Sequence, residues 1–149
     1  HEHNAEMMRP KLMARLAEGG RIGLCSDAGT PLISDPGFRL VQAVAQAGHK
    51  VIPLPGASAL LSALVGAGLP TDQFHFAGFL PSKAGARREA LQKLTAVPGT
   101  MVFYEAPHRL QESLVVMAEV LGDDRHACVA RELTKRFEEF RRGSLGGLA

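Results

Sequence analysis

The stretch RIGLCSDAGTPLISDPG, residues 21–37, runs from a short apolar segment into a polar loop and then into a helix start. Residues 21–25 are predicted to form a strand, whereas residues 26–33 carry hydroxyls, a carboxylate and a glycine. Connections in α/β units usually take about 2–6 residues, so this one is about twice the usual length. Long loops at the carboxyl ends of strands often bind ligands. The stretch therefore predicts a ligand-binding α/β unit.

Helix and strand patterns alternate on both sides of this loop. Apolar residues recur every four positions over residues 5–17, which predicts a helix. Asp35 and Pro36 are the residue types of an N-cap and a first helical position, so a second helix is expected to start there. A strand over residues 51–54 and a helix of small residues follow. The expected buried face of the second helix consists of Phe38, Val41 and Ala45.

The second half repeats this alternation after the sequence GLPTD, residues 68–72, which is the expected domain boundary. We predict a partial first domain over residues 1–70 and a C-terminally truncated second domain over 71–149. The expected strands of the second domain are 74–79, 101–105 and 126–131, its expected helices are 83–95 and 107–121, and residues 137–143 form a further candidate strand. This order favours the α/β class with a parallel sheet.

Composition fits a folded cytoplasmic protein. The 149 residues are 46% hydrophobic, enough for one core or two small ones. Cys25 and Cys128 lie in predicted strands, so we expect buried thiols of a reducing compartment. No membrane span or secretory leader is expected. The net charge of +2 neither requires nor excludes a nucleic-acid partner. A start without Met and an end where Ser144 can cap a new helix suggest a segment of a longer protein.

Two strand-to-helix loops are candidate ligand sites. In the first, residues 26–33 favour ligand contact, whereas residues 35–37 need only be a turn and a helix cap. The second loop is LPGASAL, residues 54–60. Ser58 resembles the serine of a nucleophile elbow, but that motif requires a second glycine where this chain has Leu60. Contact with a cofactor is therefore the favoured role of the second loop.

Other polar clusters have weaker signals. His1 and His3 lack further ligands at metal-binding spacing, so no metal is expected. His108 and Arg109 follow a predicted strand in a first helical turn, where a functional role and simple exposure explain them equally well. Basic residues that can neutralise RNA phosphates, or that form an ordinary solvated face, occur in two strips: Lys83, Arg87 and Arg88, and Lys135, Arg136, Arg141 and Arg142.

Five ordered motifs together resemble one family. They are SDAGTPLISDPG, PLPGASALLSAL, GLPTDQFHFAGFLPSK, MVFYEAPHRL and ARELTKRFEE. The chain is similar to the small-subunit rRNA methyltransferase I group of the tetrapyrrole methylase superfamily. The resemblance implies two α/β domains with S-adenosylmethionine bound in the cleft between them. It also implies methylation of a cytidine ribose 2′-hydroxyl in bacterial 16S rRNA, in the cytoplasm, by a homodimer.

The resemblance assigns residues to the cofactor site. The first loop contributes Ser26, Asp27, Ala28, Gly29, Thr30, Pro31, Leu32 and Ile33. The second loop contributes Pro55, Gly56, Ala57, Ser58 and Ala59. The second domain contributes Tyr104, Glu105, Ala106, Ala130, Arg131 and Glu132. The family's opening strand, its Gly-Asn-Leu-Gly-Asp turn and its Ala-Glu-Asp-Thr-Arg stretch are absent, so the first domain is expected to be N-terminally incomplete.

The sequence does not select one proton acceptor for this reaction. The candidates are Asp27, Glu105 and Glu132, with Lys135 as an electrostatic aid. Two other functions compete with RNA methylation. One is methylation of a small tetrapyrrole precursor on the same fold, because a fold does not fix a substrate. The other is a noncatalytic role in RNA binding or dimerisation.

Overall fold

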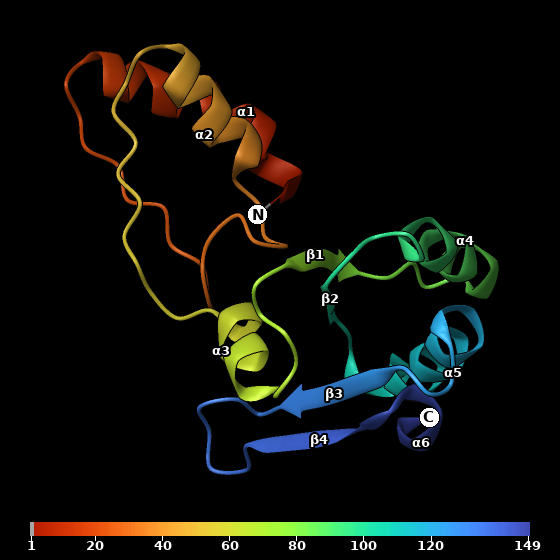
Figure 1. Ribbon diagram of the computed structural model, residues 1–149. Coiled ribbons are helices and arrows are strands. Elements are labelled where there is room, and N and C mark those ends of the chain that lie inside the picture. Colours follow the sequence, from red (N-terminus) through yellow and green to blue (C-terminus); the bar gives the residue numbers. More distant parts are fainter. Residues whose placement is uncertain (1) are drawn as a thin grey trace. The chain divides into compact units, whose positions relative to one another are not determined.

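A computed structural model describes residues 2–149, with side chains from Glu6 onward. The chain divides into two compact units, residues 1–58 and 59–149, and each is described by itself (Figure 1). The domain boundary expected at residue 70 stays a prediction.

The first unit contains two helices joined by long irregular segments (Figure 1). Helix α1 spans Glu2–Ala17, as its four-residue apolar spacing predicts, and Gly19 follows it with a φ of +83°. Helix α2 spans Phe38–Gln46. An exposed ion pair of 2.8 Å joins Arg39 to Glu6 on α1.

The two strands predicted in the first unit are absent. Residues 21–25 and 51–54 are irregular, and the unit contains no strand within residues 2–58. Their apolar side chains are exposed, from 37% for Ile22 to 82% for Leu54. A strand exists only through backbone hydrogen bonds to a neighbouring strand. Alternation of residue types predicts the segment's preference but cannot supply that neighbour.

The predicted start of α2 is also wrong. The helix begins after Gly37, whose φ of 130° is left-handed, and no side chain caps its first turn. Asp35 and Pro36 therefore precede the helix instead of opening it. The predicted buried face fails as well, because Phe38 is 64% exposed and Ala45 is exposed, leaving Val41 half-buried.

The second unit confirms the strands and helices predicted for it. Strands β1 (Phe74–Phe79) and β2 (Thr100–Tyr104) are parallel and are linked by helix α4 (Ala84–Leu94). After β2, the 3-10 turn η1 (Pro107–Arg109) leads into helix α5 (Leu110–Leu121). The remaining elements are α3 (Ala59–Gly66), β3 (His126–Arg131), β4 (Glu139–Ser144) and α6 (Leu145–Leu148).

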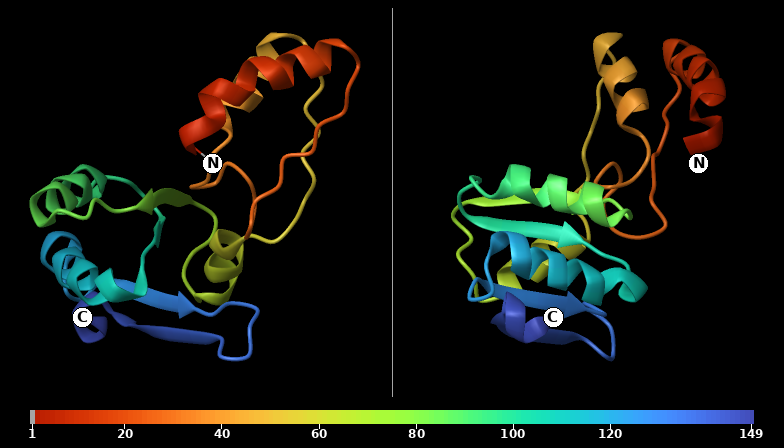
Figure 2. Two further views of the ribbon diagram at one scale, coloured as in Figure 1. Left: turned by 180° about the vertical axis from the view of Figure 1, so that it is seen from behind. Right: turned by 90° about the vertical axis from the view of Figure 1, so that its right-hand side faces the viewer.

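The strands β3 and β4 form an antiparallel hairpin, separate from the parallel pair β1–β2 (Figure 2). Ser144 caps α6 as predicted, because its side-chain oxygen accepts a hydrogen bond from the backbone N–H of Gly147. The core lies among α4, α5 and α6. It consists of Leu80, Leu91, Leu114, Met117, Ala118 and Leu145.

Helix α3 is fixed to strand β4 by two contacts. A Cβ placed on Gly66 would lie 2.3 Å from the ring of Phe140, so only glycine allows this close approach. The Arg142 guanidinium donates hydrogen bonds to the carbonyl oxygens of Gly66 and Ala67, at 2.5 and 3.1 Å. These carbonyls lack partners inside the helix, so Arg142 caps the carboxyl end of α3.

The expectation of two buried thiols needs correction. Both cysteines are free, but Cys25 is exposed because its segment has no strand partner in the first unit. Cys128 lies half-buried in β3, and burial raises the pKa of its thiol above the ordinary value. Among the described residues, no helix is both long and apolar enough to cross a bilayer.

Candidate functional site

The loop over residues 26–33 has an ordered backbone. The Ser26 hydroxyl donates a hydrogen bond of 2.9 Å to the carbonyl of Ala28 and accepts one of 3.3 Å from its N–H. Gly29 and Leu32 have left-handed φ values of 72°. That conformation is costly for leucine, so the loop holds a strained residue of the kind that concentrates at binding sites.

The structure brings this loop to the second predicted loop. The Thr30 hydroxyl donates a hydrogen bond of 2.9 Å to the carbonyl oxygen of Ala57, 27 residues away. A Cβ on Gly29 would lie 3.9 Å from the same oxygen. Two turns that the sequence places far apart are therefore held together in the first unit.

These two turns expose backbone and polar side chains that a ligand can contact. Around Gly56 an added Cβ would meet no atom within 4 Å, so the backbone there is open to a ligand. Thr30 and Ser26 supply hydroxyls, and Asp27 supplies an exposed carboxylate. Carboxylates accept hydrogen bonds from amines and hydroxyls, which are groups that S-adenosylmethionine carries. The residues present therefore fit this cofactor.

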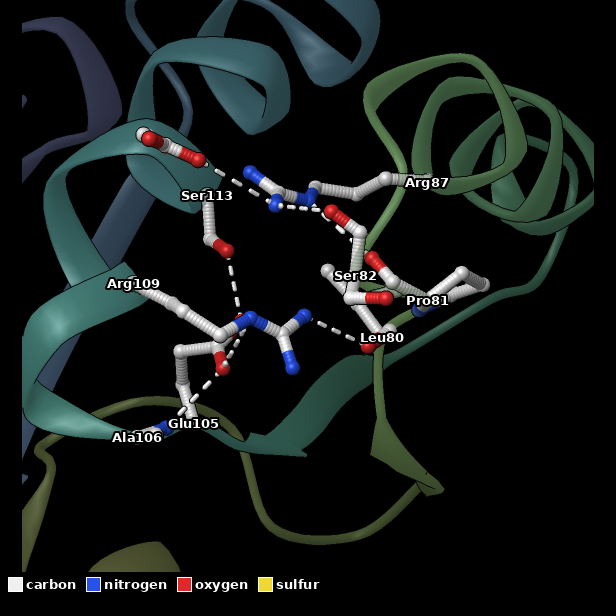
Figure 3. A network of polar contacts seen from close by, with 9 residues as sticks. Leu80, Pro81, Ser82, Arg87, Glu105, Ala106, Arg109 and Ser113 are labelled. Carbon is white, nitrogen blue, oxygen red and sulfur yellow. Dashed lines mark hydrogen bonds and ion pairs between the residues drawn. The ribbon is translucent and has the colours of Figure 1, made fainter.

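A buried polar network lies where β2 ends in the second unit (Figure 3). The Glu105 carboxylate accepts hydrogen bonds from the N–H of Ala106 at 2.9 Å and from the Ser113 hydroxyl at 2.5 Å. Arg109 pairs with Glu105 at 3.5 Å and donates a bond of 2.7 Å to the carbonyl of Leu80. The side chain of Glu105 is only 8% exposed. This network fixes the turn from β2 into α5.

Arg87 extends the network from α4. Its side chain is 1% exposed and donates hydrogen bonds to the carbonyls of Pro81 at 3.3 Å and Ser82 at 3.0 Å (Figure 3). It also pairs with Glu112 at 3.4 Å. The prediction that Arg87 belongs to an exposed RNA-binding strip is wrong, because its guanidinium is buried and already bonded. A strip counted from sequence charges alone misses that Arg87 shares a helix face with Leu91.

The candidate proton acceptors differ in their surroundings. Both carboxylate oxygens of Glu105 are engaged, so we assign it a structural role. Asp27 is exposed in the first loop. Glu132 has a φ of 49° and pairs with Lys135 at 3.2 Å, with its side chain 46% exposed.

The second-unit residues assigned by resemblance lie at strand ends. Tyr104 ends β2 and packs its ring against Phe76 and Phe79, with centroids 4.9 and 5.6 Å apart. Ala130 and Arg131 end β3, where Arg131 pairs with Glu139. That these residues contact the cofactor remains a prediction.

The remaining basic residues are exposed, but they differ in their ion pairs and in the surface on which they lie. Arg88 on α4 pairs with Glu119 on α5, whereas Lys83 precedes the first residue of α4, makes no capping bond with its side chain and is exposed. Lys135 and Arg136 lie in the loop between β3 and β4. In Figure 1 this loop and α4 lie on opposite sides of the second unit, so the two groups form separate surfaces.

Metal-binding clusters of three or more suitable side chains are absent from the described residues. His1 and the side chain of His3 lie outside what the structure describes. His108 and Arg109 occupy η1 as predicted, with His108 exposed and Arg109 in the buried network. Sequence analysis missed Ser113, whose partner Glu105 lies eight residues earlier; a single serine in a helix gives no signal of such a bond.

The element order and the strand-to-helix loops place the chain in the α/β class. Its fold is similar to that of a crystal structure titled as the methyltransferase CobJ, with a TM-score of 0.67 over 93% of this chain and 62% of that one, at 23% identity. All 149 residues match the family model described as tetrapyrrole (corrin/porphyrin) methylases. The chain belongs to the tetrapyrrole methylase family, which confirms the family predicted from its five motifs.

Curated relatives of the chain within this family share one name, ribosomal RNA small subunit methyltransferase I. The protein of Mesorhizobium japonicum is 56% identical over 100% of this chain and 51% of its own length. That of Pseudomonas aeruginosa is 53% identical over 95% and 50%, and that of Escherichia coli O157:H7 is 49% identical over 99% and 52%. The chain spans about half the length of the curated relatives it matches.

Proposed function

We propose that this chain provides the cofactor-binding turns of an S-adenosylmethionine-dependent RNA methyltransferase. Its substrate is the ribose 2′-hydroxyl of a cytidine in 16S rRNA of the small ribosomal subunit. The observation that carries the proposal is identity of 49–56% to rRNA small subunit methyltransferase I proteins along nearly the whole chain. A cytoplasmic location and a homodimer accompany this proposal as expectations.

The first unit supports the cofactor assignment. The bond from Thr30 to Ala57 holds the two turns in one place, and the open backbone at Gly29 and Gly56 admits a ligand closely. Bound S-adenosylmethionine supplies an electrophilic methyl group. The protein's task is then to orient the ribose hydroxyl and accept its proton. Asp27 and Glu132 are the carboxylates we propose for that acceptance.

The RNA-contacting residues in this proposal exclude Arg87. The exposed cations that remain are Lys83, Arg88, Lys135 and Arg136. Each phosphate contact releases counterions, so the RNA affinity should fall with rising salt concentration.

Calorimetric titration with S-adenosylmethionine, performed on the complete protein that contains residues 1–149, tests the cofactor site. Thr30→Val removes the hydroxyl that donates to the Ala57 carbonyl and keeps the side-chain shape. The affinity of this variant for S-adenosylmethionine should fall about fivefold, because one hydrogen bond contributes about 1 kcal/mol. Thr30→Ser keeps the hydroxyl and should bind like the wild type. Equal affinity of all three proteins would remove Thr30 from the site, and wild-type protein that binds no cofactor would contradict the proposal.

A small tetrapyrrole precursor is the second candidate substrate. It is favoured by the description of the matching family, tetrapyrrole (corrin/porphyrin) methylases. Transfer of methyl label to a tetrapyrrole precursor and not to RNA would select this alternative.

A further inference from the structure

An exposed aromatic ring lies on the loop between β3 and β4. Phe137 is 69% exposed, whereas Phe140, three residues later in the sequence, is half-buried against Gly66 on α3. The contact between β4 and α3 therefore uses Phe140, whereas Phe137 stays exposed to solvent. Fully burying such a ring stabilises a protein by roughly 1.5–3 kcal/mol, so a partner that covers it would be favoured.

The loop that carries Phe137 is closed by its own hydrogen bonds. The N–H of Thr134 donates to the Glu138 carboxylate at 2.7 Å, and the N–H of Lys135 donates to the carbonyl of Glu132 at 3.0 Å. Glu132 and Thr134 adopt left-handed φ values of 49° and 64°. The ring thus sits on an ordered turn, which lowers the entropy lost when a partner binds.

Charges surround the ring. The Arg136 guanidinium lies over it, 5.5 Å from the ring centroid. Glu139 forms ion pairs with both Arg131 and Arg141. Hydrogen bonds from the two guanidinium groups, the larger effect from Arg141, lower the pKa of the Glu139 carboxyl. Among the described residues Arg136 makes no ion pair with a carboxylate. Its charge is therefore available to an external anion.

We propose that this loop binds single-stranded RNA, with an unpaired base stacked on Phe137 and a neighbouring phosphate paired with Arg136. The inference rests on the proposed function and names how its substrate is held. An aromatic face beside a cation that has no carboxylate partner is an arrangement that binds single-stranded nucleic acids. A protein partner would need a wider apolar surface, whereas the residues beside Phe137 are charged.

Binding of a short single-stranded RNA oligonucleotide, followed by fluorescence anisotropy, tests the loop. Base stacking on an aromatic side chain implies that Phe137→Ala weakens binding about 5- to 100-fold. Phe137→Trp keeps an aromatic face and should retain the affinity. Phe38→Ala removes a comparably exposed ring from α2 and should leave RNA binding unchanged.

Salt dependence separates the two residues of the pair. Arg136→Ala should lower the slope of log affinity against log salt concentration by about 0.7, the value for one phosphate contact on a single strand. Phe137→Ala should weaken binding without changing that slope, because stacking releases no counterions.

Three results would overturn the inference. The first is an unchanged RNA affinity of Phe137→Ala, and the second is an equal loss of RNA affinity in Phe38→Ala. The third is a loss in Phe137→Ala together with a changed sedimentation mass, because the ring would then belong to a contact between copies of the chain. Methyl transfer to small-subunit RNA, measured on the same variants, separates this failure from that of the proposed function. If Phe137→Ala is active and binds RNA with wild-type affinity, only the role of the loop is contradicted. If the wild type is inactive and binds no RNA, the role of the loop and the proposed function are both contradicted.

Discussion

At the scale of single residues, Gly99 is the position least able to accept a side chain. It precedes β2 with a φ of +85°, and an added Cβ would lie 2.3 Å from the backbone oxygen of Gln73. That oxygen also accepts the N–H of Thr100 at 2.9 Å, so it cannot move without breaking the bond. Gly99→Ala should lower the free energy of unfolding by about 2–4 kcal/mol, measured by urea denaturation.

A second glycine provides the matched control. Gly85 lies in α4 without a left-handed φ, and a Cβ there meets no atom within 4 Å. Gly85→Ala should raise stability by about 0.5–1 kcal/mol, because alanine favours a helix. Loss of stability in Gly85→Ala, or none in Gly99→Ala, would contradict the geometry of these turns.

The two cysteines should differ in their reaction with a thiol reagent. Cys25 is exposed, whereas burial raises the pKa of the Cys128 thiol above its ordinary value. Since the thiolate is the reactive form, Cys128 should react more slowly, and its rate should level off only at a higher pH than that of an ordinary thiol. Mass spectrometry of the labelled chain over a pH series measures both rates. In denaturant the two should react alike; a faster Cys128 in the folded protein would be evidence against its burial.

At the scale of elements, the network around Arg87 predicts a contrast between neighbouring arginines. Arg87→Ala leaves the carbonyls of Pro81 and Ser82 without their donor and should cost about 2–4 kcal/mol of unfolding free energy. Arg88→Ala removes only an exposed ion pair with Glu119 and should cost about 0–1 kcal/mol. Thermal or urea unfolding of the two variants measures both losses of unfolding free energy. Equal losses would contradict the burial of Arg87.

Sequence patterns predicted the second unit far better than the first. The strand over 74–79 and the helix over 83–95 appear within one residue of their predicted ends, because each has its neighbour nearby in the chain. Residues 21–25 and 51–54 have strand composition but no neighbouring strand in the first unit. Periodicity therefore identifies what a segment prefers, and pairing decides whether it forms.

The candidate site follows the same division. Two turns of the first unit were predicted as one ligand site, and the bond from Thr30 to Ala57 joins them. The charge of Arg87 predicted RNA contact, yet its place on the same helix face as Leu91 buries it. Charge in a sequence gives no direction in space, whereas helical spacing does. The exposure of Phe137 was not predicted either, because it depends on which phenylalanine packs against α3.

At the scale of the whole molecule, the central claim is methyl transfer to the small-subunit RNA. The relatives that support it are about twice as long as this chain, so the assay requires the protein with whatever its reading frame encodes beside residues 1–149. A fold of this class carries several substrates, and binding of the cofactor alone cannot distinguish between them.

The most direct measurement supplies S-adenosylmethionine with a labelled methyl group, small ribosomal subunits and a tetrapyrrole precursor to this protein. We predict label in 16S rRNA at one cytidine, whose adjoining phosphodiester bond then resists alkaline hydrolysis because its 2′-oxygen is methylated. Label in the tetrapyrrole with none in the RNA, or RNA label on a base that leaves every bond sensitive to alkali, would contradict the account.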